Sequence, residues 1–394
     1  MKRVNFIANR DPIINYTLAP VRHNRRQLRD RGFDLQIHTK LSDACLDCDI
    51  LCLISKPTYK HVAETNAVFQ DGGPIIELLK KARARAGTII WMDDSDSSSV
   101  THFELMPYID LYLKKQILRD PNLYREPFYG GRIFTNFYHR QFGVEDEIPF
   151  AQFHPLQSED EAKLHVSWNI GLGDMFSAFA LKQFAQRFAP DLVPVDYDVD
   201  FVDPRTKRPI DIFLRTSANL SRKTIAFHRQ EMLRRLDGYF SSHKNRTGMV
   251  GNNIYQTEDG AARASALPET GGHLPIKTYR DVLSETKILP SPFGWGELGV
   301  RDYEAFIFGG MLLKPDMSHM ETWPDIFIPN QTYVPLKWGF EDLDEVLDAA
   351  IMDDKKTIHI AQAGQDAYRN SISVAGMERF CDRFIQQMGG IKND

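Results

Sequence analysis

Short apolar runs that alternate with amphipathic stretches constrain the fold of this chain more than any other feature. In the first half the apolar runs cover 4–8, 33–38, 49–54, 88–92, 109–113 and 163–168, and stretches of helical character such as 22–31 and 74–86 lie between them. Strands that alternate with helices form βαβ units, which build a mainly parallel sheet. Because such crossovers are right-handed, the carboxyl ends of the strands meet at one edge, where ligands bind.

The alternation breaks at 189–209, which holds four prolines and little periodicity, and we place a domain boundary there. A helix is expected at 174–188 before the break. After it, strands are expected at 210–215, 286–290, 311–314 and 325–328, helices at 222–236, 299–310, 343–352 and 366–387, and a loop region at 248–272. The sequence therefore predicts an α/β protein with two Rossmann-like domains, 1–190 and 191–375, facing across a cleft, and a closing segment 376–394.

Composition narrows the class of protein. The 394 residues carry 48 Lys and Arg against 53 Asp and Glu, a net charge of −5, which gives no strong global field for nucleic acid or anionic lipid. No window of about 18 apolar residues predicts an integral membrane segment, and the first apolar run is too short for a signal peptide. Three of the four cysteines lie within 45–52 without a partner Cys/His pair at zinc spacing, so we expect reduced thiols and a cytoplasmic protein.

The segment from Ser291 to Gly310 holds the densest group of chemically informative residues. An expected strand runs into a glycine-rich turn with Gly294 and Gly296, and then into a helix. Glycines let the backbone approach a ligand, and a helix N-terminus attracts phosphate. Arg301 in the first turn could clamp a diphosphate, and Glu304 could accept two ribose hydroxyls. Glu297 in the turn could accept hydroxyls of a sugar. The alternative is a tight turn with solvated carboxylates, but the convergence of these residues favours a nucleotide-sugar site.

This segment also carries a family resemblance. The stretch from Ser291 to Leu336 resembles the nucleotide-sugar-binding half of GT-B glycosyltransferases, and most of all a bacterial group with exostosin-like and spore-maturation-type enzymes. In that group an Arg-x-x-Glu-Ala helix start, a Gly and a short apolar strand form the donor pocket. Here Arg301, Glu304 and Ala305 match, so the resemblance implies that Glu304 binds the ribose. It also implies that a C-terminal helix, 376–394, crosses back onto the N-terminal domain. In GT-B enzymes the two glutamates are one residue further apart than Glu297 and Glu304, so only Glu304 matches in register.

Three further basic residues are expected near the donor. Arg215 stands at the end of the first strand of the second domain, and Lys314 and His319 follow a later strand. Arg215 and Lys314 could bind phosphate. His319 could contact base or sugar, but a structural role is the favoured interpretation of this loop histidine. The other basic residues of 222–235 are interpreted mostly as a solvated helix face.

Acidic residues at a strand end of the first domain are candidates for the acceptor side. Asp93, Asp94 and Asp96 end the run 88–92, and one of them would be the base if the reaction inverts the anomeric centre. The alternative is that they cap a helix and solvate the loop. Asp94-Ser95-Asp96 is also an Asp-x-Asp pattern, but it lies in the wrong half for a metal on the donor. Asp174 is a spare candidate, interpreted as a helix cap.

The sequence thus predicts a metal-independent hexosyl- or pentosyltransferase without a cofactor. It would move a sugar from a nucleoside diphosphate donor to a hydroxyl acceptor, such as a glycan or a glycolipid precursor. Three alternatives stay open: transfer to a modified DNA base, a non-catalytic scaffold subunit, and a sugar-nucleotide epimerase of the same shape.

Overall fold

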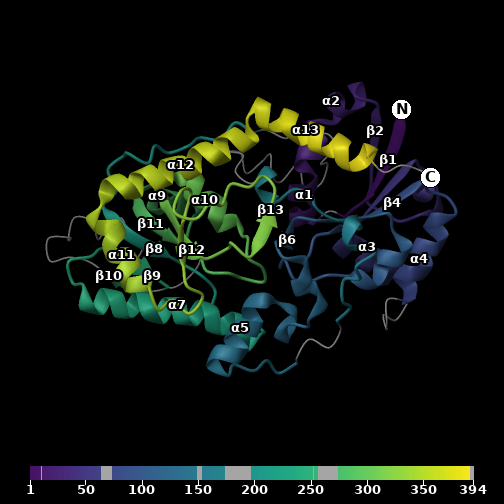
Figure 1. Ribbon diagram of the computed structural model, residues 1–394. Helices are drawn as coiled ribbons and strands as arrows, with labels where there is room; N and C mark the ends of the chain where they lie inside the picture. Colours follow the sequence, from purple (N-terminus) through teal and green to yellow (C-terminus); the bar gives the residue numbers. More distant parts are fainter. Residues whose placement is uncertain are drawn as a thin grey trace.

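The computed structural model describes residues 1–9, 11–63, 73–148, 153–173, 197–251, 253–255 and 274–390. It contains two six-stranded sheets, one in each half of the chain (Figure 1). The strands and longer helices of the first half are β1 (Lys2–Ile7), α1 (Pro12–His23), α2 (Arg25–Asp30), β2 (Phe33–His38), β3 (Ile50–Ile54), α3 (Ser55–Ala63), α4 (Gly73–Arg83), β4 (Thr88–Asp93), β5 (Leu111–Lys114), β6 (Gln116–Leu118), α5 (Ile133–Phe142) and β7 (Leu164–Val166).

The second half begins its sheet at residue 210. Its elements are β8 (Ile210–Leu214), α7 (Lys223–Ser242), β9 (Gly248–Val250), β10 (Asn253–Tyr255), α9 (Ile276–Ser284), β11 (Thr286–Pro290), α10 (Val300–Phe308), β12 (Met311–Pro315), β13 (Met320–Thr322), β14 (Val334–Leu336), α11 (Leu343–Met352), α12 (Asp354–Ile372) and α13 (Val374–Gly389).

The first sheet has the order β2-β1-β3-β4-β5-β7, and every neighbouring pair is parallel. This is the flavodoxin-like order of doubly wound folds. Its central strands β3, β4 and β5 are buried on both faces, as parallel strands covered by helices must be. Val4 and Phe6 pack with α1, α2 and α13, whereas Leu51 and Leu53 pack with α4 on the other side.

The second sheet has the order β10-β9-β8-β11-β12-β14, in which only β10 is antiparallel to its neighbour. Counted from β8, this is the Rossmann order 3-2-1-4-5-6. One face packs on α9 and α10, and the other on α7, α11 and α12. The expected α/β class with two Rossmann-like sheets is confirmed.

Three expected elements differ from the structure. Within the expected loop 248–272, residues 248–250 and 253–255 form β9 and β10, because Met249 and Val250 are buried against the sheet despite the polar residues around them; 256–272 lie outside the described residues. Residues 325–328, expected as a strand, form none; the neighbouring strands are β13 and β14. The expected helix 366–387 is two helices that meet at Ser373, which caps α13 by accepting a hydrogen bond from the Gly376 N–H. The helix expected at 174–188, with Asp174, lies outside the described residues.

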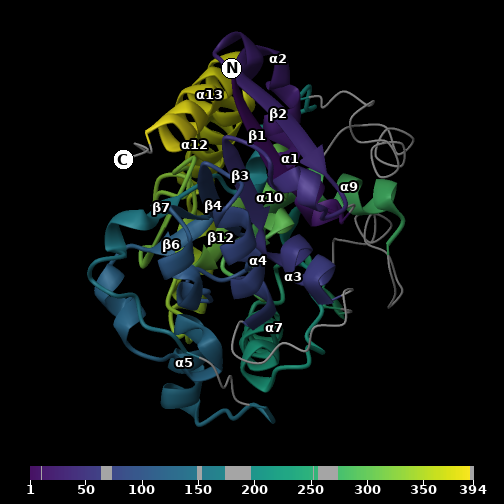
Figure 2. The ribbon, with the colours of Figure 1, turned by 90° about the vertical axis from the view of Figure 1, so that its right-hand side faces the viewer.

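The two halves are joined at the carboxyl ends of their strands. β6 of the first half pairs antiparallel with β13 of the second (Figure 1). α13 then returns to the first half and lies along α1 and α2 (Figures 1 and 2), where Phe384 contacts the Phe33 ring edge-on at 5.8 Å. One hydrophobic cluster runs through both halves. The joined halves bring the loops after β4 and β11 into direct contact.

Candidate functional site

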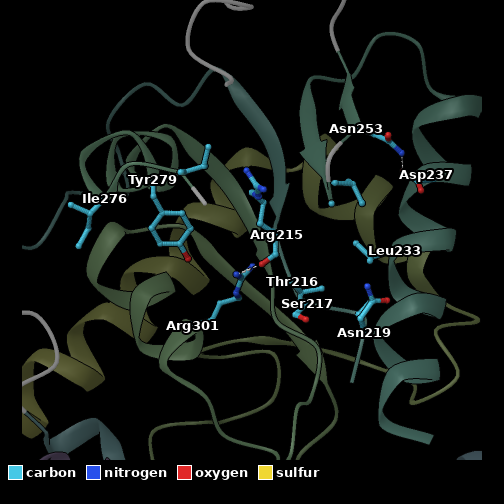
Figure 3. Close-up of a pocket in the computed structure, with 14 residues that line it drawn as sticks. Arg215, Thr216, Ser217, Asn219, Leu233, Asp237, Asn253, Ile276, Tyr279 and Arg301 are labelled. Carbon is cyan, nitrogen blue, oxygen red and sulfur yellow. Dashed lines mark hydrogen bonds between the residues drawn. The ribbon is translucent and has the colours of Figure 1, made fainter. Parts of the chain in front are cut away.

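A cavity of about 950 Å³ opens at the carboxyl edge of the second sheet. The cavity lies between the ends of β8 and β11, where the strand order of the sheet reverses direction. Ligands of doubly wound folds bind at such a reversal point. Figure 3 shows Tyr279 and Ile276 on one side and Leu233, Asp237 and Asn253 on the other. The other lining residues are Arg215, Thr216, Ser217, Ala218, Asn219, Val250, Gly251, Leu274 and Arg301.

Three arginines gather beside this cavity. Arg301, from the first turn of α10, donates a hydrogen bond to the carbonyl of Arg215, the residue after β8 (Figure 3). Arg229 of α7 donates to the Ser217 carbonyl at 2.8 Å. Burial lowers the pKa of Arg229, and the nearby Arg301 lowers it further. Neither Arg229 nor Arg301 forms an ion pair with a carboxylate of the described residues, so their positive charge is available to an anionic ligand.

A carboxylate lies next to these cations. Glu304 follows Arg301 by nearly one turn of α10, and Tyr279 of α9 donates its hydroxyl to Glu304 Oε2 at 2.7 Å. Burial raises the pKa of Tyr279; Arg301 opposes this, and the Glu304 carboxylate adds to it. Tyr279 therefore stays a hydrogen-bond donor and orients Glu304. The structure brings Arg215, Arg301 and Glu304 together, as the sequence grouped them.

The glycine-rich turn after β11 packs against protein on both sides. A Cβ at Gly294 would lie 2.5 Å from Arg229 Nη2, and a Cβ at Gly296 would lie 1.5 Å from the Asp96 carbonyl oxygen. Asp96 belongs to the first half of the chain. The two glycines were expected to let the backbone approach a ligand. In the structure the groups that approach them are Arg229 and the first half of the chain, and neither glycine lines the cavity.

Glu297 is fully buried between the halves, outside the cavity lining. Its carboxylate accepts hydrogen bonds from the Ser97 hydroxyl at 3.0 Å, the Ser98 hydroxyl at 2.7 Å and Gln116 Nε2 at 3.2 Å. His319 Nε2 lies 3.6 Å from Glu297 Oε1. Burial alone would raise the pKa of Glu297, but His319 and Ser98 lower it to about 2. Glu297 therefore connects the halves and His319 supports it, and neither residue lines the cavity.

Lys314 is also buried away from the cavity. Its ammonium lies 2.8 Å from Asp302 Oδ1, and Ser291 donates its hydroxyl to the same carboxylate. The other oxygen, Asp302 Oδ2, accepts a hydrogen bond from the Gly299 N–H at 2.8 Å. Burial lowers the pKa of Lys314, whereas Asp302 opposes that shift. This buried pair fixes the start of α10, and hence the position of Arg301.

The three aspartates after β4 differ in their surroundings. Asp93 is buried and accepts hydrogen bonds from Lys114 Nζ at 2.9 Å and the Tyr112 hydroxyl at 2.6 Å. Burial would raise the pKa of Asp93, but Lys114 holds it well below its usual range. Asp94 accepts a hydrogen bond from the backbone N–H of Lys56 at 2.8 Å, so it caps α3, which begins at the end of the neighbouring strand.

Asp96 is the most exposed of the three, with 35% of its side chain accessible. Its Oδ1 lies 3.1 Å from both Lys56 Nζ and Lys115 Nζ. Burial would raise the pKa of Asp96, but Lys115 and Lys56 lower it. The two carboxylates of the Asp-x-Asp pattern, Asp94 and Asp96, therefore form ion pairs with lysine ammonium groups in this structure. Within the described ranges, no three His, Cys, Asp or Glu side chains are grouped as a possible metal site.

Two further observations concern the remaining sequence predictions. All four cysteines are free thiols, and burial raises the pKa of Cys48 to about 11, which keeps it in the unreactive thiol form. No helix in the described part of the chain has the length and apolar character needed to span a bilayer.

Sequence reasoning missed several residues of this region. It assigned Arg229 to a solvated helix face, whereas the side chain reaches the Phe293 carbonyl at 3.0 Å. It did not single out Tyr279, Asp302 or Arg132. The signal for Arg229 is its place one residue after His228, whose side chain is fully buried and accepts a hydrogen bond from the Phe293 N–H. That part of α7 therefore faces the glycine-rich turn.

No protein-family model and no curated protein matches this sequence. Among solved structures, Anabaena HepE in complex with UDP-glucose aligns over 98% of this chain and 100% of that chain, with 10% identity and a TM-score of 0.42. A glycosyltransferase from Rickettsia africae aligns over 99% of both chains, with 11% identity and a TM-score of 0.42. An α1,3-fucosyltransferase with GDP aligns over 98% of this chain and 90% of that chain, with 11% identity and a TM-score of 0.40. This chain is thus remotely similar to structures of glycosyltransferases.

Proposed function

We propose that this protein is a glycosyltransferase that binds a nucleoside diphosphate sugar in the cavity between β8 and β11. The observation that carries the proposal is the group of Arg215, Arg229 and Arg301 at the reversal point of a Rossmann-ordered sheet, with Glu304 beside it. Guanidinium groups suit a diphosphate, and a carboxylate suits the two hydroxyls of a ribose. The remote likeness to nucleotide-sugar enzymes agrees with this function but does not carry it.

The arginines would do most of the chemical work. When the bond from the anomeric carbon to the diphosphate breaks, negative charge grows on the departing phosphate, and Arg215 and Arg301 would stabilise it. The N-terminus of α10 would add its partial positive charge. Because these groups supply the positive charge, we propose transfer of a hexose or pentose without a resident metal. Lys314, Glu297 and His319 would act indirectly, by holding the turn that precedes α10.

On the acceptor side, we propose Asp96 as the base that accepts a hydrogen bond from the acceptor hydroxyl. Asp93 and Asp94 are less suitable, because they are buried and hydrogen-bonded to protein groups. A glycan or glycolipid precursor remains our favoured acceptor, in keeping with the exostosin-like and spore-maturation-type resemblance. Asp96→Asn should lower kcat more than it raises KM for the donor, because Asp96 would not touch the nucleotide.

Isothermal titration calorimetry with UDP, GDP, ADP and dTDP and their glucose or mannose conjugates tests the donor site. One base should bind, and Arg301→Gln should weaken that binding ten- to a hundredfold, which is about 1.5–3 kcal/mol for a charged hydrogen bond. Glu304→Gln should weaken nucleoside diphosphate binding but not pyrophosphate binding. The matched control is Arg205→Gln, because the Arg205 side chain is 72% exposed and lies away from the cavity.

The same titrations separate the alternatives. If no nucleotide binds, the glycosyltransferase proposal is wrong and a scaffold role becomes the better explanation. If the bound donor is interconverted without an acceptor, the protein is an epimerase. Binding that is equally strong in Arg301→Gln would remove the cavity as the donor site. A DNA acceptor would reveal itself by salt-dependent retardation of duplex DNA.

A further inference from the structure

A second cavity, of about 630 Å³, opens at the carboxyl ends of β12 and β14. Its lining comes from both halves of the chain: Phe137 and Gln141 belong to α5, whereas Asp316 and most of the segment 335–342 belong to the second half. It shares no lining residue with the proposed donor cavity. A cavity of this volume is large enough to hold a small organic ligand.

An indole held by its neighbours lines this cavity. The Phe137 ring lies edge-on to the Trp338 ring, with the centroids 5.5 Å apart, and His319 packs edge-on against Trp338 at 5.0 Å. Trp338 Nε1 donates to the Asp316 carbonyl at 2.8 Å, and the Trp338 carbonyl accepts a hydrogen bond from the Tyr138 hydroxyl at 2.6 Å. The indole is also partly exposed. A fixed aromatic face of this kind offers apolar area to the C–H face of a pyranose at a small cost in entropy.

The polar groups beside the indole are mostly hydrogen-bond acceptors. Three carboxylates and one amide line the cavity, and they belong to Asp316, Glu341, Asp342 and Gln141. Glu341 is exposed and forms no hydrogen bond or ion pair with another residue of the described ranges. Lys337 is the one cation among the residues that line the cavity. Carboxylates accept hydrogen bonds from sugar hydroxyls, whereas they repel an anionic sugar.

A chain of hydrogen bonds connects this cavity to the glycine-rich turn. His228 Nε2 accepts a hydrogen bond from the Phe293 N–H at 2.8 Å, and burial lowers the pKa of His228 well below its ordinary value. The proton of the neutral ring is therefore on Nδ1, which donates to the Tyr138 oxygen. Tyr138 in turn donates to the Trp338 carbonyl. A ligand on Trp338 would thus lie next to the segment that leads to α10 and Arg301.

We propose that this cavity binds an uncharged pyranose unit of a carbohydrate. The ring packs on Trp338, and its hydroxyls donate hydrogen bonds to Glu341 and Asp316. The position between the two halves suits a sugar unit of the acceptor that lies beyond the reacting one. That role rests on the proposed glycosyltransferase function, whereas the binding of a carbohydrate does not.

Isothermal titration calorimetry of the whole protein with cellobiose, maltose, diacetylchitobiose and α1,4-digalacturonate tests the site. At least one of the three neutral disaccharides should bind, and digalacturonate should bind at least tenfold more weakly. Trp338→Ala should weaken binding of the neutral disaccharide at least tenfold, because the ring loses the surface on which it packs. Glu341→Gln should weaken it three- to tenfold, because an amide oxygen is a weaker acceptor than a carboxylate.

The matched control is Glu345→Gln, because Glu345 is exposed on the adjoining helix α11 and lies outside the cavity lining. Melting temperatures are measured alongside, since Trp338→Ala also removes packing against Phe137 and His319. If that variant melts at a markedly lower temperature, Glu341→Gln carries the test, because the exposed Glu341 side chain has no described partner to lose.

The site would be overturned if no neutral disaccharide binds, if digalacturonate binds as tightly as the neutral disaccharides, or if Trp338→Ala and Glu341→Gln both leave binding unchanged. Loss of disaccharide binding in Arg301→Gln but not in Glu341→Gln would also overturn it, because the probe would then occupy the donor cavity. Nucleoside diphosphate titrations run in parallel keep the two proposals apart: a protein that binds no nucleotide but binds a disaccharide through Glu341 contradicts only the proposed function.

Discussion

Glu297 and Ser98 are 199 positions apart in the sequence, yet the Ser98 backbone N–H donates a hydrogen bond to Glu297 Oε2 at 2.9 Å. This contact joins the loop after β4 to the turn after β11. Removing a buried carboxylate that accepts several hydrogen bonds is costly in folding free energy, because each donor would lose its partner. Glu297 therefore fixes how the two halves meet.

Glu297→Ala should destabilise the protein by about 2–4 kcal/mol, because it leaves donors on Ser97, Ser98 and Gln116 buried without an acceptor. Urea unfolding followed by tryptophan fluorescence measures this loss. Glu345→Ala, at an exposed glutamate of α11, should change the free energy of unfolding by less than about 0.5 kcal/mol. Equal effects of the two substitutions would contradict the role of Glu297.

The stabilisation by Glu297 should depend on pH. The pKa of Glu297 is about 2 in the folded protein, below its ordinary value of 4.5, so its contribution is full above pH 4.5 and is lost as the pH falls toward 2. The difference in unfolding free energy between wild type and Glu297→Gln should therefore shrink between these pH values. A difference that stays constant over this range would show that the carboxylate charge does not matter.

Gly296→Ala should separate the two halves locally, because the new Cβ would meet the rigid Asp96 backbone at 1.5 Å. We expect a loss of about 2–4 kcal/mol, or several degrees in melting temperature, by differential scanning calorimetry. Gly299→Ala in the same turn is the control, since no atom lies within 4 Å of its added Cβ. If both variants melt alike, the close approach at Gly296 is not what limits the packing.

Lys314→Met should cost about 3–5 kcal/mol, because it leaves the Asp302 carboxylate charged and buried without its cation. Adding Asp302→Asn should recover part of this loss, by about 1–3 kcal/mol relative to the sum of the single changes. The exposed pair Lys277 and Asp281 should show almost no coupling in the same double-mutant cycle. Additive losses at Lys314 and Asp302 would contradict a direct pairing.

Tyr279→Phe should weaken binding of a nucleoside diphosphate about three- to tenfold, because Glu304 loses the hydroxyl that orients it, worth about 1 kcal/mol. Pyrophosphate, which has no ribose, should bind equally well to both proteins. Calorimetry at one ionic strength gives both values. An equal loss for pyrophosphate would mean that Tyr279 acts on the phosphates instead.

Local pattern in the sequence predicted most of the strands. Residues 49–54 and 88–92 cover β3 and β4 as expected, because strands that are buried on both faces are largely apolar. The apolar pattern did not predict β9 and β10, because strands of three residues are too short to show the alternation of apolar and polar residues that marks a strand. The cluster of Arg215, Arg301 and Glu304 was foreseeable, because Arg301 and Glu304 share one helix face and parallel strand ends share one edge.

The sequence by itself thus determined a doubly wound α/β chain in two halves and the group of charges at the edge of the second sheet. Only the tertiary structure decided which of those residues face the cavity. Glu297, Gly296 and His319 were grouped with the donor by their position after a strand. Glu297 and Gly296 instead contact the first half of the chain, and His319 contacts Glu297. The contact of Arg132 with the Trp295 carbonyl has the same origin, since contacts between distant segments depend on how the halves pack and leave no period in the sequence.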